Sequence, residues 1–194
     1  MELESITPDP TALRALSHPV RLRILGMLRA DGPATASTLA TQLALNSGAT
    51  SYHLRQLALH GFIVDVPERG NGRDRWWRAA HQATRTEKRP SGPDERDAED
   101  AFSQAVAVIH TEQLQRAVEE RPLLPADWRA ASTLSDWSLV VTAARAEQLT
   151  EALIGFVESW DEDDDDPAAE QYMVVLHTYP RPGRLAVPEL AAET

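Results

Sequence analysis

The chain of 194 residues contains no cysteine, which excludes disulfide bonds, thiolate-bound metals and cysteine nucleophiles. No apolar run approaches the ~20 residues of a membrane-spanning helix. The first twenty residues are acidic and contain no apolar core segment, so we expect no signal peptide, no contact with a membrane and a cytoplasmic location. The composition that remains, 42% hydrophobic and 25% charged, is typical of a globular protein with one large or two small domains.

The charge of the chain is unevenly distributed around a formal total of −11. Residues 1–90 contain 12 Lys and Arg against 8 Asp and Glu, a balance of +4, whereas residues 91–194 contain 7 against 22, a balance of −15. Salt screens charges beyond roughly 8 Å, so a local positive face attracts phosphate in spite of an acidic total. A basic half joined to an acidic half predicts two separate tasks.

Two helices are predicted near the N-terminus from their capping signals. Asp9 and Pro10 are typical of the first two positions of a helix. Ser17 is predicted to cap the next helix, which has Pro19 in its first turn and is closed by Gly32. The apolar residues of this second helix recur at helical spacing, so we expect one of its faces to be buried.

A break, NSG at residues 46–48, separates two further predicted helices. ATASTLATQLAL is the first of them. The second has Leu54, Leu57 and Ala58 facing inward and ends at Gly61. The opposite face then carries small or hydrogen-bonding side chains: Gly48, Ala49, Ser51, Tyr52, Arg55 and Gln56.

The segment FIVDVPERGNGRDRWWRA predicts two strands around a Gly-Asn-Gly turn, a β-hairpin. Because side chains alternate along a strand, we expect Arg75 and Trp77 on one face and Trp76 and Arg78 on the other. We expect both tryptophans to pack rather than to stack on bases. Only some of the arginines near the tip can therefore face one ligand.

The second half is predicted to contain a long helix and a small α/β unit. Residues 83–93, polar and with two prolines, predict a linker between domains at 1–82 and 94–194. A long helix from Asp94 to about Glu120 has two apolar stripes. An apolar surface of this width needs more than one neighbouring element to cover it. WSLVVTA, RAEQLTEALIGFVESW and QYMVVLHTYP predict a strand, an amphipathic helix and a second strand. The expected fold class is α+β.

Three segments together are similar to a known family of DNA-binding proteins. ALSHPVRLRIL at residues 15–25, SYHLRQL at 51–57 and GFIV at 61–64 resemble the core of the ArsR/SmtB-type bacterial repressors, over about residues 9–80. The resemblance implies a winged helix-turn-helix fold whose second motif helix lies in the major groove of double-stranded DNA. It also implies a homodimer, joined by the long helix, on a pseudo-palindromic operator.

The candidate DNA-binding residues lie on the outward face of the fourth helix and around the hairpin tip. Polar side chains there donate hydrogen bonds to bases or phosphates, and the arginine fork binds them bidentately. A helix face and a hairpin tip that are merely solvated are the alternative. The candidates are Ser47, Gly48, Ser51, Tyr52, Arg55, Gln56, Arg69, Asn71, Arg73 and Arg75.

Metal sensing by the routes of this family is not expected. Such sensors bind metal through cysteines in the third helix or through His and Asp in the last helix. The third helix here has no ligand, and His110 in the long helix has only Asp100 ten residues upstream. His18, directly before Pro19, is expected to start a helix rather than to bind a metal. We predict no metal and no cofactor, and a small-molecule effector stays open.

The acidic half contains two features with alternative interpretations. The run DEDDDDPAAE at residues 161–170 is expected to be a solvated loop, with a loose divalent-cation patch or an intramolecular DNA mimic as alternatives. Trp128, Trp137, Trp160 and Tyr172 are expected to pack in a core, with a ligand pocket as the alternative.

The expected function is that of a dimeric, DNA-binding transcription regulator. A protein-interaction module that kept the winged fold is the alternative, because a fold does not fix a function. An enzyme in the C-terminal half ranks last, since the sequence shows no nucleophile elbow, phosphate-binding loop or dinucleotide fingerprint. The sequence does not identify the operator, the effector or the direction of regulation.

Overall fold

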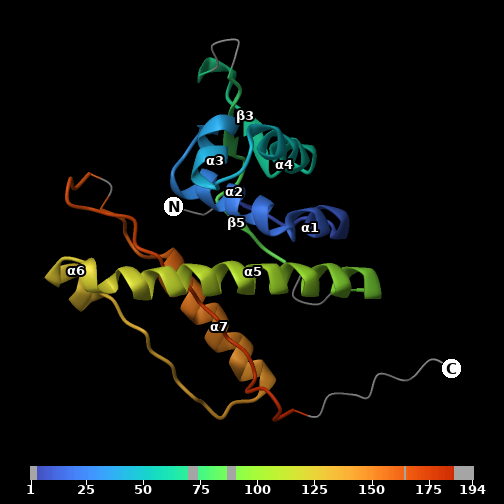
Figure 1. The fold of residues 1–194 in the computed structure, drawn as a ribbon. Helices are drawn as coiled ribbons and strands as arrows, with labels where there is room; N and C mark the ends of the chain where they lie inside the picture. The colour runs from blue at the N-terminus through green and yellow to red at the C-terminus, as the bar shows by residue number, and fades with distance from the viewer. Residues whose placement is uncertain (1–3, 70–73, 87–90, 164, 186–194) are drawn as a thin grey trace. The chain divides into compact units, whose positions relative to one another are not determined.

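The structure is a computed structural model, and its contacts divide the chain into two compact units, Met1–Asp136 and Trp137–Thr194. The residues that it describes are 4–69, 74–86, 91–163 and 165–185. Helices and short strands alternate along the first unit, whereas the described part of the second unit contains a single helix (Figure 1). No helix within these ranges is long and apolar enough to cross a membrane.

Four helices begin the first unit: α1 (Pro10–Leu16), α2 (Pro19–Ala30), α3 (Ala36–Gln42) and α4 (Ser47–Leu59). The Asp9 carboxylate caps α1 by accepting a hydrogen bond from Ala12 N at 2.8 Å, as the sequence predicts. The N-cap of α2 is His18, so the prediction that Ser17 caps this helix is wrong. Ser17 instead ends α1, because its hydroxyl donates to Leu13 O at 2.8 Å.

The apolar faces of these helices meet in one core. The largest side chains that are fully buried there are Leu16, Ile24, Leu25, Leu39, Leu54, Leu57, Phe62 and Ile63. The predicted inward positions of α4 are therefore confirmed, and Ala58 packs against the same core while partly exposed. Gly32 and Gly61 follow α2 and α4 with φ of 81° and 75°, the left-handed backbone that glycine adopts at a helix end.

Three short strands form an antiparallel sheet in the order β2 (Ala34–Thr35), β4 (Trp76–Ala79) and β3 (Ile63–Asp65). Asp65 lies opposite Trp77, so the two strands predicted from the sequence do pair, and β2 joins them as a third. A 3-10 turn, η1 (Pro67–Arg69), follows β3. The Gly-Asn-Gly turn predicted at residues 70–72 lies outside the described residues.

A second pair of strands is parallel and joins β1 (Ser5–Ile6) to β5 (Ala83–Thr84). The first two residues of the predicted linker therefore belong to a strand. Arg29 holds this region to α2, because its guanidinium donates to His81 O and to Thr84 Oγ1, both at 2.9 Å. Burial lowers the pKa of Arg29 to about 10.

The long helix α5 (Pro93–Glu120) begins one residue before its predicted start. One of its two predicted apolar stripes packs against α1 and α2, where Ala98 and Ala105 are buried. Arg23 of α2 forms an ion pair with Glu112 of α5. Figure 1 shows α5 lying along α1. These contacts fix α5 to the helices that precede it.

The contacts therefore group α5 with the first unit, whereas the sequence analysis assigned it to a domain at 94–194. The cause is the buried alanine stripe, which brings two helix backbones close together. The other predicted stripe of α5 stays exposed at Leu114 and Val118. A 3-10 turn, η2 (Arg121–Leu123), and α6 (Ala126–Ala131) complete this unit.

The second unit contains α7 (Ala143–Glu158), which confirms the predicted amphipathic helix. Thr142 caps it by accepting a hydrogen bond from Arg145 N at 3.3 Å. The strands predicted at 137–143 and 171–180 are not formed: the described chain has no strand after Thr84. A strand exists through the backbone hydrogen bonds of a neighbouring strand, and neither segment obtains such a ladder from the described residues.

The prediction that the aromatic residues of this unit pack in a core is also wrong for the single chain. Trp137, Trp160 and Tyr172 are all more than half exposed. No described residue from 137 to 185 is buried. Packing needs a facing surface, and the described part of this unit contains only one helix with two extended flanks.

Candidate nucleic-acid interface

Helices α3 and α4 are separated by a tight break, and a side chain caps the N-terminal start of each helix. Thr35 Oγ1 accepts from Thr38 N at 3.2 Å at the start of α3, and Asn46 Oδ1 accepts from Ala49 N at 2.7 Å at the start of α4. A Cβ at Gly48 would lie 3.3 Å from Asn46 Oδ1, so a larger residue there would press on the cap. The N-terminal end of α4 is therefore fixed in place.

The outward face of α4 presents the residues that the sequence predicts. Tyr52 and Arg55 are exposed, as are Ser47 and Gly48, while Ser51 and Gln56 are partly exposed. Arg55 forms no hydrogen bond or ion pair with another residue in the described ranges. These six positions thus form one continuous surface on a helix whose other face is locked into the core.

Two residues of α4 have structural roles that the sequence did not predict. Thr50 is fully buried, and its hydroxyl donates to Asn46 O at 3.1 Å. The His53 ring contacts the His18 ring with centroids 4.7 Å apart. His53 precedes Leu57 by four residues, a spacing that places both on one helix face, so periodicity could have identified it.

This histidine pair connects the start of α2 to α4. The His18 Nδ1 accepts from Val20 N at 3.2 Å, which confirms the expectation that His18 starts a helix. Burial, reinforced by the charge of Arg21, lowers the pKa of His18. Burial, followed by the charges of His18 and Arg21, lowers the pKa of His53. Both rings therefore favour the neutral form.

The two arginines early in α2 have partners within the chain. Arg21 Nε donates to Ala15 O, and burial lowers its pKa. Arg23 is paired with Glu112. Both side chains therefore help to hold α2 to its neighbours.

Two arginines of the hairpin lie against its two tryptophan rings. Arg75 Nε donates to Asp65 Oδ2 at 2.7 Å, and its guanidinium carbon lies 4.2 Å from the centroid of the Trp77 ring. Trp77 is buried, which confirms that it packs, and the predicted common face of Arg75 and Trp77 is observed. Arg69 lies 5.7 Å from the centroid of the Trp76 ring.

Arg69 and Arg75 are thus exposed while aromatic contacts restrain their side chains. Arg78 is exposed as well and donates to Ala79 O at 3.2 Å. The predicted contacts of Asn71 and Arg73 lie outside the described residues. The hairpin and α4 follow each other directly in the first unit, and both belong to the basic half of the chain.

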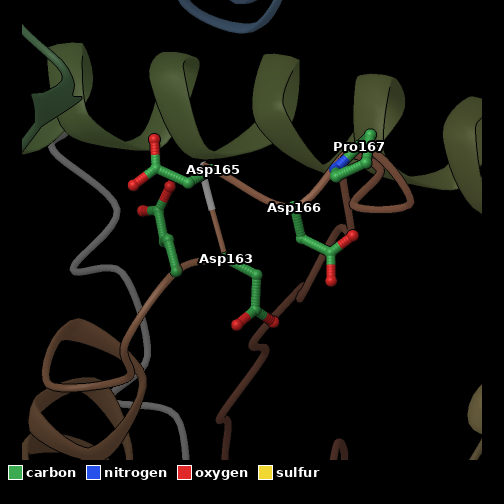
Figure 2. A pocket seen from close by; sticks show the side chains of 5 residues that line it. Asp163, Asp165, Asp166 and Pro167 are labelled. Atoms are coloured by element: carbon green, nitrogen blue, oxygen red, sulfur yellow. The ribbon is translucent and has the colours of Figure 1, made fainter.

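The acidic run after α7 surrounds an open hollow lined by Glu162, Asp163, Asp165, Asp166 and Pro167. Figure 2 shows the carboxylates of Asp163, Asp165 and Asp166 turned in different directions. Asp166 Oδ1 accepts from Ala168 N at 2.8 Å within the loop. All the described residues of the run are exposed, as in a solvated loop. Among the residues that the structure describes, no three His, Asp or Glu side chains gather to hold a metal ion.

The sequence from α2 to β3 matches a family model described as a helix-turn-helix domain, at residues 16–66. The chain carries a helix-turn-helix domain. The matched range contains α2, α3 and α4, and α4 presents the exposed polar face described above. A helix-turn-helix domain indicates a DNA-binding regulator.

Two further comparisons add nothing to this assignment. No curated protein matches the chain. Among solved structures, the crystal structure of RV1404 from Mycobacterium tuberculosis is similar at 20% identity and a TM-score of 0.30, over 79% of this chain and 86% of that one.

Proposed function

We propose that this chain is a sequence-specific transcription regulator, a dimeric repressor similar to the ArsR type that binds a pseudo-palindromic operator in double-stranded DNA. The observation that carries the proposal is the surface of α4. Its polar face is exposed, while Leu54 and Leu57 on the opposite face are fully buried. A helix held in this way can enter the major groove without loss of its own packing.

The side chains of α4 suit the reading of bases. Arg55 is the best candidate for a base contact, because an arginine binds the O6 and N7 acceptors of guanine bidentately. Gln56 pairs with adenine by similar geometry, and Ser51 and Tyr52 donate to bases or phosphates. Gly48 lets the backbone approach the sugar-phosphate chain closely.

The hairpin formed by β3 and β4 takes the role of the wing in this proposal. Arg69 and Arg75 are restrained by Trp76 and Trp77, so less side-chain entropy is lost when they contact phosphate. These contacts attract any duplex and position the protein, whereas α4 selects the sequence.

A dimer is required because one recognition helix reads only a half-site. A two-fold dimer places two copies of α4 about 34 Å apart, one turn of DNA. The exposed stripe of α5 with Leu114 and Val118 supports a role in joining the copies. The function proposed is thus one of binding and not of catalysis, and we assign it no metal or cofactor.

Fluorescence anisotropy tests the proposal, with the purified full chain and a duplex from the DNA upstream of its own gene. A duplex of the same composition in shuffled order is the control, and salt is varied for both. We expect preference for the upstream duplex and an affinity that falls steeply as salt rises. Equal, weak binding to the two duplexes would contradict the proposal and favour a protein-interaction module.

A further inference from the structure

The second unit exposes more apolar surface than a stable single domain carries. Val140 is 105% exposed and Trp137 82%, and on α7 the side chain of Phe156 is 62% exposed. None of the described residues in this unit is buried. An isolated helix of this length is marginal in water, and exposed apolar patches of this kind mark interaction surfaces.

The exposed apolar side chains of this unit lie before, on and after its helix. Leu139 precedes α7, Ile154 lies on it, and Met173 follows it, and all three are exposed. Exposed apolar side chains gathered in this number mark an interaction surface, so we expect a partner to cover them.

Two extended segments of the unit have the composition of strands. They are 137–141 (WSLVV) and 172–176 (YMVVL), rich in the aromatic and β-branched residues that sheets favour. No backbone hydrogen bond joins residues 137–141 or 173–176 to another residue in the described ranges. Extended apolar chain with open backbone groups is a template for pairing with another strand.

The charge of these segments suits contact with an identical copy. Residues 137–144 and 171–180 contain no Asp, Glu, Lys or Arg, so two copies meet there without repulsion. The run at 161–170 is strongly acidic, so two copies of it repel each other, and it stays outside such an interface. The second segment already lies on α7, since Thr178 Oγ1 is 3.0 Å from Thr150 Oγ1 (Figure 1).

We propose that a second copy of this chain covers this surface by strand pairing. Residues 137–141 and 172–176 form strands only when they pair with the same segments of the partner copy. The apolar face of α7, with Leu149, Leu153 and Phe156, packs on the sheet that results. The proposal rests on the proposed function in one respect, since an operator-bound dimer supplies the second copy. It goes further in that the fold of the unit depends on the dimer.

Sedimentation velocity of the full chain, from nanomolar to micromolar concentration, tests the proposal through Val140→Asp. The side chain of Val140 is fully exposed, so the change leaves the packing of a single chain intact. In the dimer it buries an unpaired charge, and we expect the dissociation constant to rise by about 100-fold or more. The matched control is Leu59→Asp on α4, also at an exposed aliphatic side chain, which should leave the dimer unchanged.

Val174→Pro and Val175→Pro test the strand pairing itself. Adjacent amides of a strand point to opposite edges, so one of the two variants removes an N–H that faces the partner copy. We expect that variant to dissociate, while far-ultraviolet circular dichroism shows the helices of the first unit unchanged. Hydrogen exchange of the amides at 137–141 should be slow in the dimer and fast in the dissociated variants.

A wild-type chain that sediments as a monomer at every concentration would overturn the proposal. A dimer that Val140→Asp and both proline variants leave intact would also overturn it, because another surface then joins the copies. The DNA assay separates this failure from that of the proposed function. A dimer that the three variants leave intact and that prefers the upstream duplex refutes only the pairing surface, and a pairing-dependent dimer without preference refutes only the regulator.

Discussion

Helices α4 and α7 are both amphipathic, yet they differ completely in what covers them. In α4 the apolar residues Leu54 and Leu57 are fully buried against three other helices and a sheet. In α7 the equivalent residue Leu153 is 38% exposed, and Phe156 on the same apolar face is 62% exposed. The comparison teaches that helical periodicity predicts the helix and its inward face, but not the surface that this face meets. For α4 that surface lies in the same chain, and for α7 we assign it to a second copy.

The largest expected effect compares the two leucines directly. Leu54→Ala leaves a cavity in a closed core, so we expect the free energy of unfolding to fall by about 2–5 kcal/mol. The loss should not depend on protein concentration. Urea unfolding followed by circular dichroism measures it.

Leu153→Ala is the matched change in the second unit. At dilutions where the chain is a monomer it should cost less than about 0.5 kcal/mol, as expected for an exposed position. Its cost should grow as concentration rises and the dimer forms. If Leu153→Ala lowered the free energy of unfolding of the monomer as much as Leu54→Ala does, the two helices would not differ in burial as we describe.

Arg55→Ala tests whether sequence reading belongs to the first unit alone. Removal of a bidentate base contact should weaken binding to the upstream duplex by about 1–3 kcal/mol and leave binding to the shuffled duplex nearly unchanged. Anisotropy titrations on both duplexes measure the difference. Arg145→Ala on α7 removes the same charge from the second unit and should change neither affinity. If the two variants behaved alike, the selection of sequence could not be assigned to α4.

Arg69→Ala on the hairpin should have a smaller and less selective effect. A lost phosphate contact weakens binding to both duplexes similarly and reduces the slope of log affinity against log salt by about 1. The salt titration that checks this also distinguishes the wing from α4. If Arg69→Ala weakened binding to the upstream duplex alone, we would assign base contacts to the hairpin as well.

The smallest effect is a dependence of stability on pH within the first unit. The pKa of His18 and of His53 is lowered on folding, so the unfolded chain binds protons more readily than the folded one below pH ~6.5. Their contribution to stability is complete above that pH and is lost as the pH falls through the lowered values. The Tm should decrease between about pH 7.5 and 5.5, and less so in His53→Gln. An identical decrease in the variant would assign the effect to other groups.

Much of the first unit could be predicted from local patterns. The inward residues of α4, the pairing of β3 with β4 and the face shared by Arg75 and Trp77 all follow from periods of 3.6 and 2 residues. The sequence did not predict β2 or the pairing of β1 with β5. Strands of two residues carry no periodic signal, and their partners lie far along the chain.

The caps show where local reasoning fails even at short range. Both Ser17 and His18 can cap a helix, and the choice depends on whether the serine hydroxyl is already used by α1. The contact of His18 with His53 depends in turn on how α2 and α4 cross. These outcomes are decided by neighbours in space, which a one-dimensional pattern does not contain.

The sequence by itself determined the helices, their inward faces and the separation of a basic half from an acidic one, because these depend on local spacing and composition. Only the tertiary structure decided that α5 belongs with the N-terminal helices and that the segments flanking α7 form no strand with the residues that the structure describes. The physical reason is the same for both. Burial and strand pairing need a second surface, and its location is a property of the folded chain rather than of any segment.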